Sequence, residues 1–240
     1  MKNLSFFLLI VLVLTKANSF AQQAKNVLIF SKTTGFRHNS IPKGVRVVTD
    51  LFAKQGIKSF HTEDAAFFCQ DSLNNYDAVL FLSTTGDIFT TEQKAAFQAF
   101  IQAGNGYVGI HAASDTEFNW PWYGQLVGGY FSSHPSVQEA KIEVQNRKHP
   151  ATKHLQRVWF HKDEWYDFKD VKEGLNILMT LDEGSYKGGK MGKFHPIAWF
   201  QEFDGGRSFY TGLGHTEESF DSIDFQKHIV GGVKYVLKLN

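Results

Sequence analysis

GNGYVGIHAASD, the stretch from Gly104 to Asp115, holds the features around which we expect the chain to fold. Its apolar centre predicts a short buried strand, Gly104 favours the end of a preceding helix, and the small residues after His111 allow a tight turn. His111 and Asp115 would then leave the carboxyl end of the strand, where open α/β sheets keep their functional groups. A histidine there is equally typical of core packing, so its role depends on its surroundings.

Apolar runs of strand length alternate with helical patterns before this stretch. Ser40 is placed to cap a first helix, which Gly56 ends. Thr90 and Gln93 have capping-box spacing ahead of a helix over residues 91–103. Such alternation predicts a doubly wound α/β sheet with right-handed crossovers. The strands that we expect before the quoted stretch are residues 26–31 (NVLIFS), 58–62 and 78–83 (AVLFLS).

The loops after the first, third and fourth strands should gather at one edge of this sheet, where ligands bind in such folds. These loops carry Arg37 with His38, residues 85–87, and His111 to Asp115.

The second half of the chain has a different pattern, typical of added antiparallel strands. Residues 137–145 alternate apolar and polar side chains as a half-exposed strand does. Asp204 begins a hairpin turn signal, and residues 223–237 have the apolar spacing of a helix that packs on the sheet. Further strands are expected at residues 165–168, 176–181, 197–203 and 207–211, and a short helix at residues 122–127. No linker or repeat divides the chain.

The first 21 residues have the pattern of a secretory signal peptide. Lys2 forms a charged start, residues 6–14 are apolar, and Ser19 with Ala21 offers small residues before a cut at Gln22. The apolar run is well short of the roughly 20 residues that span a membrane, and no other segment is long and apolar enough to do so. We therefore expect a single domain over residues 22–240 that is periplasmic or secreted.

Composition argues against nucleic acid as a partner and against an internal disulfide. A formal charge of +1 leaves no basic stripe for nucleic acid. Cys69 is the single cysteine, so no internal disulfide can form, and its apolar AAFFC context should raise the thiol pKa. Trp120 and Trp122 belong to a tryptophan-rich second half in which sugar-stacking surfaces are a possibility beside ordinary packing.

Five motifs in order resemble the ThuA-like (trehalose utilisation) family across nearly the whole chain after the leader. They are GNGYVGIHAASD, GGYFSSHP at 128–135, KDEWYDF at 162–168, HPIAWF at 195–200 and GRSFYTGLGHT at 206–216. The resemblance implies a flavodoxin-like fold of the class I glutamine amidotransferase kind, a three-layer sandwich with a mostly parallel central sheet. It also implies a role in the use of a disaccharide, glycoside or keto-sugar.

The amidotransferase fold carries its nucleophilic cysteine where this chain has His111. Imidazole can shuttle protons or bind a metal ion, but it cannot form the thioester that amidotransfer needs. The chain is therefore not expected to be a cysteine amidotransferase.

A histidine constellation remains as the candidate site. We expect the catalytic groups to be His111, Asp115, Glu164 and His215, and the substrate-binding groups to be Arg37, His38, Trp120, Trp122, His134 and His195. Asp163 is an alternative to Glu164 as the carboxylate partner. Two mechanisms fit these side chains: acid–base catalysis by histidine with a carboxylate, or a zinc-like ion held by His111, His134 and His215.

Two functions follow from these expectations. One is an enzyme that acts on a small carbohydrate by hydrolysis, elimination or isomerisation, since each needs proton transfer beside a hydroxyl or carbonyl. The alternative is a non-catalytic carbohydrate-binding module that uses Trp120 and Trp122 as its stacking surface.

Overall fold

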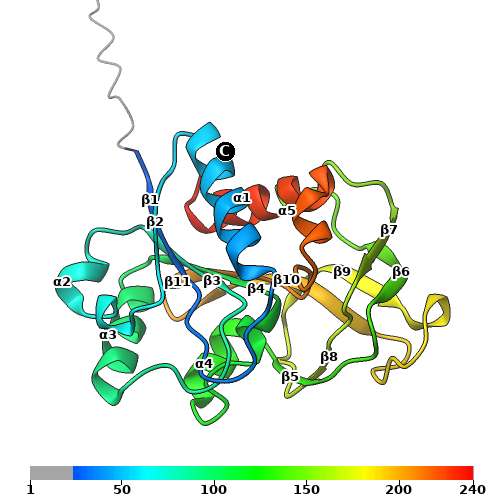
Figure 1. Ribbon diagram of the computed structural model, residues 1–240, viewed down its shortest axis with the longest axis horizontal. Coiled ribbons are helices and arrows are strands. Elements are labelled where there is room, and N and C mark those ends of the chain that lie inside the picture. The colour runs from blue at the N-terminus through cyan, green and yellow to red at the C-terminus, as the bar shows by residue number, and fades with distance from the viewer. Residues whose placement is uncertain (1–23, 240) are drawn as a thin grey trace, which may run out of the picture.

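Nine strands form one mixed sheet at the centre of the computed structural model, which describes residues 24–239 (Figure 1). The expected signal peptide lies outside these residues. Along the sheet the strands follow the order β2 (Lys58–Thr62), β1 (Asn26–Phe30), β3 (Ala78–Leu82), β4 (Gly106–Ile110), β11 (Gly206–Thr211), β10 (His195–Phe203), β9 (Asn176–Asp182), β6 (Gln138–Val144) and β7 (Val158–Asp163). β5 (Tyr130–Ser133) and β8 (Asp167–Lys169) pair separately as a small antiparallel sheet.

Neighbouring strands are parallel from β2 to β11 and antiparallel from β11 to β7. Strands β3 and β4 are buried along their whole length, as expected for the continuous apolar runs of a parallel sheet. The predicted α/β fold, with a mostly parallel core and added antiparallel strands, is confirmed.

Helices cover both faces of the sheet, which gives the expected three layers (Figure 1). α1 (Ile41–Lys54) and α5 (Ile223–Val236) lie on one face, whereas α3 (Thr91–Gln102) and α4 (Pro121–Val127) lie on the other with the short α2 (Gln70–Leu73). Among residues 24–239 no helix combines the length and apolar character that crossing a membrane requires.

The two predicted caps have different outcomes. Thr90 and Gln93 form the expected capping box at the start of α3. Ser40 occupies the N-cap position of α1, but its side chain makes no cap bond. Its hydroxyl instead donates to the carbonyl of Gly214 at 3.0 Å, which ties the first loop to the loop after β11.

Strand prediction was wrong where aromatic and charged residues mix. Strand β7 was not predicted, because its residues VWFHKD form an edge strand with little apolar contrast between its faces. The strand expected at residues 165–168 is reduced to β8. Strand β7 helps to build the candidate site, because Asp163 ends it and Glu164 follows directly.

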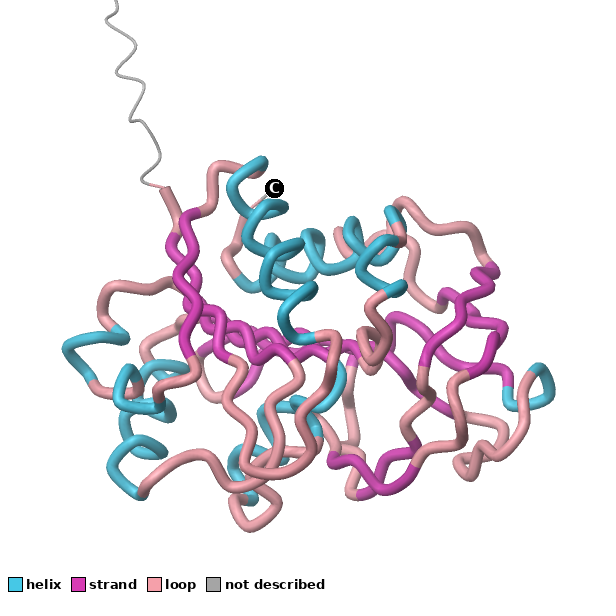
Figure 2. The backbone as a smooth tube through the Cα atoms, viewed as in Figure 1, coloured by secondary structure: helices cyan, strands magenta, loops and turns pink. Residues whose placement is uncertain are grey.

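The loops after β1, β3 and β4 run beside one another beyond the ends of their strands, as predicted (Figure 2). Single bridges join Thr33 to Thr85 and Gly86 to Thr116. The amide of Gly86 also donates to the carbonyl of Asp115 at 2.8 Å. These bonds extend the parallel sheet into its loops and hold them in register.

Close packing of α5 on β11 gives a first testable prediction. A Cβ added to Gly232 would lie 2.4 Å from carbon atoms of the Phe209 ring. Gly232→Ala should therefore lower the free energy of unfolding by about 2 kcal/mol, even though alanine favours helix. Lys227→Ala, an exposed change on the same helix, should stay within about 0.5 kcal/mol. Urea unfolding of both variants tests the expectation, which equal stabilities would contradict.

Buried His228 on α5 gives a prediction about pH. Its Nδ1 donates to the carbonyl of Ala151 at 2.8 Å. Burial, aided by the nearby His154, His149 and His161, lowers the pKa of His228 from 6.5 to about 3. Below pH 6.5 His228 binds a proton in the unfolded chain but stays neutral in the folded protein. The contribution of neutral His228 to the unfolding free energy is therefore complete above pH 6.5 and declines as the pH falls toward 3.

Between pH 7 and 5 the wild type should therefore lose about 2 kcal/mol of unfolding free energy more than His228→Gln, whose side chain cannot be protonated. Urea unfolding at both pH values measures the difference. Parallel losses in the two proteins would show that His228 is not the group responsible.

Candidate functional site

His111 lies at the floor of the candidate site, directly after β4. It begins a short 3-10 turn (His111–Ser114), has a left-handed backbone with φ 50°, and its side chain is completely buried. Its Nδ1 lies 2.9 Å from the carbonyl oxygen of Gly212. Since a carbonyl only accepts, Nδ1 carries a hydrogen in this contact. The other ring nitrogen, Nε2, faces the remaining residues of the site.

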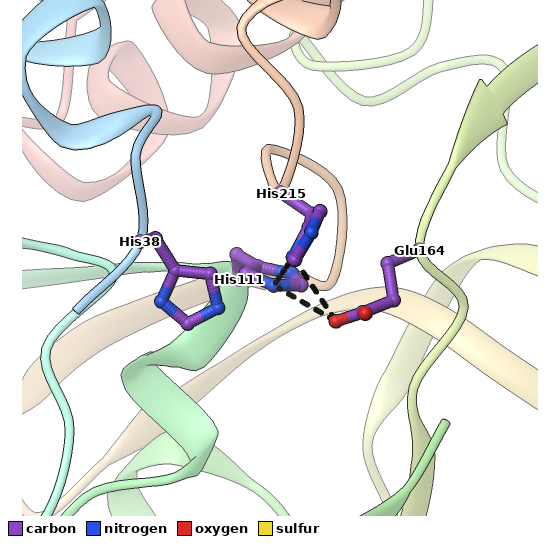
Figure 3. A group of neighbouring side chains, drawn as sticks. All are labelled: His38, His111, Glu164 and His215. Carbon is purple, nitrogen blue, oxygen red and sulfur yellow. Dashed lines mark hydrogen bonds and ion pairs between the residues drawn. The ribbon is translucent and has the colours of Figure 1, made fainter. Parts of the chain in front are cut away.

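Three further side chains from separate parts of the chain gather around the His111 ring (Figure 3). His111 Nε2 is 3.2 Å from His215 Nδ1 and 3.6 Å from Glu164 Oε2. His215 Nδ1 and Glu164 Oε2 are 3.0 Å apart. The ring of His38 stands edge-on to those of His111 and His215, with centroids 4.8 and 5.1 Å away. We call His38, His111, Glu164 and His215 the four-residue cluster.

Each member of the cluster comes from a different loop. His38 follows β1, His111 follows β4, Glu164 follows β7 and His215 follows β11. The antiparallel half of the sheet thus brings Glu164 to the edge at which the parallel strands end. Within residues 24–239, the four residues each offer one ligand atom, and all these atoms lie within 4.8 Å of one another.

Asp163 connects two of these loops. Its buried carboxylate accepts the amides of Gly214 at 2.7 Å and Thr216 at 3.2 Å, on either side of His215. It also accepts the hydroxyl of Ser219 at 2.8 Å. Asp163 therefore fixes the His215 loop against the strand end that carries Glu164.

The charge states of Glu164 and His38 suit metal binding. Burial alone would raise the pKa of Glu164, but hydrogen bonds to His111 and His215 and the charges of those rings lower it to about 2. Burial and the neighbouring His111 and His215 lower the pKa of His38 to about 3. At neutral pH the cluster thus presents a carboxylate and a neutral His38.

The pKa of His215 shifts in the opposite direction to that of His38. Burial opposes its charge, but the hydrogen bond and charge of Glu164 outweigh burial and raise the pKa of His215.

Among the described residues, Nδ1 of the buried His38 has no hydrogen-bond partner. A neutral imidazole with a free buried nitrogen is the form that ligates metal ions.

Asp115 lies at the margin of the cluster. It ends the turn that begins at His111 and is half-buried. Burial raises its pKa from 3.8 to about 6, although His111, Lys169 and His134 partly oppose this shift. A carboxyl group with this pKa can accept and return a proton near neutral pH.

His134, which we expected among the metal ligands, lies outside the four-residue cluster. It is exposed, and its Nδ1 contacts the outer oxygen, Oε1, of Glu164 at 2.8 Å. Its place in the set is taken by His38, which we expected to bind substrate, and by Glu164. The expected trio of His111, His134 and His215 stays a prediction, but the geometry favours His38 and Glu164 over His134 beside the other two imidazoles.

His195 lies in a second buried group, away from the cluster. Its Nδ1 is 2.8 Å from Glu183 Oε1, and its Nε2 donates to the carbonyl of Tyr166 at 2.8 Å. Asp167 completes the group, and its oxygens accept the amide of Lys190 and the hydroxyl of Ser133. His195 is completely buried, and the carboxylates of its group accept amides of the loop before β10 at Lys190 and Met191.

Three other expected substrate contacts point elsewhere. Arg37 forms a two-point ion pair with Glu63, at 2.7 and 3.0 Å. Trp122 donates to Asp204 at the β10–β11 turn, at the opposite end of β4 from His111, and Trp120 stacks on it. The structure does not bring these residues to the cluster.

Cys69 also departs from expectation. It is exposed, and its hydrogen bond with Ser72 lowers the pKa of the thiol, which we expected burial to raise. It belongs to the connection after β2 and is not a member of the cluster.

Some contributors could not be identified from sequence. The Gly212 carbonyl that orients His111 is a backbone group with no sequence signal. Tyr166, whose ring lies 4.2 Å from that of His111, stood in a motif but had no expected role. Phe36, two residues before His38, is 66% exposed yet contacts the His38 ring.

Comparison with known proteins places this geometry in context. The family model described as ThuA, trehalose utilisation, matches residues 26–236. No functionally curated protein matches the chain. A ThuA-like protein from Bacteroides uniformis is 23% identical, with a TM-score of 0.76 over 89% of this chain and 92% of that one. One from Parabacteroides merdae is 20% identical, with a TM-score of 0.76 over 90% of each chain.

A β-galactosidase from Bacillus circulans shares the fold more distantly. It is 13% identical, with a TM-score of 0.60 over 90% of this chain but only 31% of its own. At these identities the likeness concerns the fold alone.

Proposed function

The chain belongs to the ThuA family, and from this premise we propose that it is a carbohydrate-utilisation enzyme whose four-residue cluster holds a divalent transition-metal ion, with zinc as the best candidate. Three imidazoles and one carboxylate form a ligand set that suits zinc.

The spacing of the ligand atoms carries the proposal. Zinc bonds of about 2.0–2.1 Å in a tetrahedral site place neighbouring ligand atoms about 3.3 Å apart. In the cluster, His111 Nε2 to His215 Nδ1 measures 3.2 Å, and the contacts of these two atoms with Glu164 Oε2 measure 3.6 and 3.0 Å. The hydrogen bond from His111 to Gly212 adds the outer support that metal-bound histidines have.

The ion would act by polarising a substrate oxygen or a bound water. Asp115 would accept or return the proton, since its raised pKa of about 6 keeps both forms available near neutral pH. His134, exposed beside Glu164, would contact the substrate from the solvent side. Hydrolysis, elimination and isomerisation of a sugar all need an oxygen to be polarised and a proton to be transferred.

A metal-free acid–base enzyme is the second candidate, and one contact favours it. Glu164 raises the pKa of His215 at a separation of 3.0 Å, which is the geometry of an oriented histidine acid.

A role as a pure binding module with Trp120 and Trp122 as its platform has less support, because those rings pack beside the β10–β11 turn. We also propose that the mature protein begins at Gln22 and works outside the cytoplasm.

Turnover with and without metal tests the proposed function. The mature protein would be purified without a chelating column and assayed against mono- and disaccharides, including trehalose and their keto derivatives. Product should form, stop after treatment with a chelator and return on addition of zinc. Turnover that survives complete metal removal would favour the acid–base mechanism, and binding without product would contradict enzymatic function.

A further inference from the structure

Phe36 is a large apolar side chain that the fold leaves in water beside the candidate site. It is 66% exposed, whereas His38, two residues later, is 3% exposed. The two rings meet edge-on, with centroids 4.9 Å apart and planes at 84°. Phe36 therefore lies against one member of the four-residue cluster and leaves most of its surface to solvent.

The backbone that carries Phe36 is held in place. The hydroxyl of Thr85 donates to the carbonyl of Phe36 at 2.9 Å. The amide of Thr34 donates to the carbonyl of Thr85 at 2.9 Å, and Thr33 bridges to Thr85. Because the loop is pinned to its neighbour, the exposed ring is presented on an ordered support.

The ring also lies one side chain away from the centre of the cluster. Phe36 contacts His38, and His38 contacts both His111 and His215. A ligand group of roughly the size of one aromatic ring that covered Phe36 would lie beside His38, whose ring contacts both other imidazoles. Pyranose sugars have this size, an apolar C–H face that packs on aromatic rings, and hydroxyls at the rim.

We propose that Phe36 is the stacking platform of a pyranose subsite, so that a hydroxyl or carbonyl of the stacked sugar reaches the four-residue cluster. This inference rests on the proposed function and names its substrate class. Phe36 takes the part that Trp120 and Trp122 were expected to play. A sugar at this position would shield the cluster from water on the Phe36 side.

Sugar binding by platform variants tests the proposal. Zinc-loaded mature protein would be titrated with glucose, methyl glucosides and trehalose and observed by saturation-transfer NMR. Phe36→Ala should lower the affinity for the sugar about tenfold, and Phe36→Trp should bind the sugar at least as well as wild type. Phe160→Ala removes a ring of similar exposure, 59%, on strand β7, and should bind as wild type does.

Zinc content and melting temperature are measured on the same samples, and both should be unchanged in Phe36→Ala. Wild-type affinity in that variant would overturn the subsite, as would loss of zinc in parallel with loss of sugar, since that would indicate a structural role. If wild type retains zinc but binds none of the sugars, the subsite is overturned while the metal site stands. If wild type holds no zinc, the metal proposal itself fails.

Discussion

Replacing Glu164 by glutamine should remove the metal ion and abolish turnover. Glu164 is the one carboxylate in the four-residue cluster, and its pKa of about 2 keeps it charged at any pH at which the protein works. Glutamine keeps the shape and one oxygen but loses the negative charge that balances a dication. We expect metal affinity to fall at least about 100-fold, measured by competition with a chromophoric chelator.

Glu183→Gln is the matched control for this change. Glu183 also pairs with a buried histidine, His195, at 2.8 Å, but it belongs to the second group. Metal affinity should remain at the wild-type value in this variant. Equal loss in the two variants would mean that the ion, if one is bound, is not held by the four-residue cluster.

Asp163→Asn should weaken metal binding without touching a ligand atom. The two oxygens of Asp163 receive hydrogen bonds from Gly214, Thr216 and Ser219, which hold the His215 loop. The amide group of asparagine would face at least one of these donors, so the loop would shift and His215 with it. We expect metal affinity to fall about 10- to 100-fold and the unfolding free energy to fall by about 3 kcal/mol.

A milder variant separates positioning from general instability. Ser219→Ala removes the hydroxyl donor to Asp163 but leaves the backbone bonds from Gly214 and Thr216, so metal affinity should change less than about threefold even if stability falls. Metal affinity that follows stability in the same proportion in both variants would contradict a positioning role for Asp163.

The fold was predictable because its signals are local. The apolar runs of β1, β3 and β4 and the capping box at Thr90 each occupy a few neighbouring residues. Their alternation is enough to predict a parallel sheet and the edge at which its loops meet. Strand β7 was not predicted because it is an edge strand, and its sequence VWFHKD forms no continuous apolar face.

The candidate site was only partly predictable because it depends on contacts between distant segments. His111 stood out since it ends a buried strand, and His215 and Glu164 stood in recognisable motifs. Which imidazole completes the cluster depends on how the loop after β1 lies against β4, and no spacing in the sequence reports that. The sequence therefore did not predict that His38, and not His134, would lie within ligand distance of His111 and His215.

Residue type also misled where packing decides exposure. Trp120 and Trp122 are the larger aromatics, but both are partly buried against the core. Phe36 carried no sequence signal beyond its place beside Arg37 and His38. Asp163 was considered as a partner for histidine, yet its oxygens are directed at backbone amides.

Zinc titration of chelator-treated mature protein, followed by calorimetry, tests the central claim most directly. Wild type should bind one zinc ion per chain, and His111→Ala should bind at least about 100-fold more weakly while its melting temperature stays close to that of wild type. Absence of binding by wild type, or undiminished binding by His111→Ala, would contradict a metal site in the four-residue cluster.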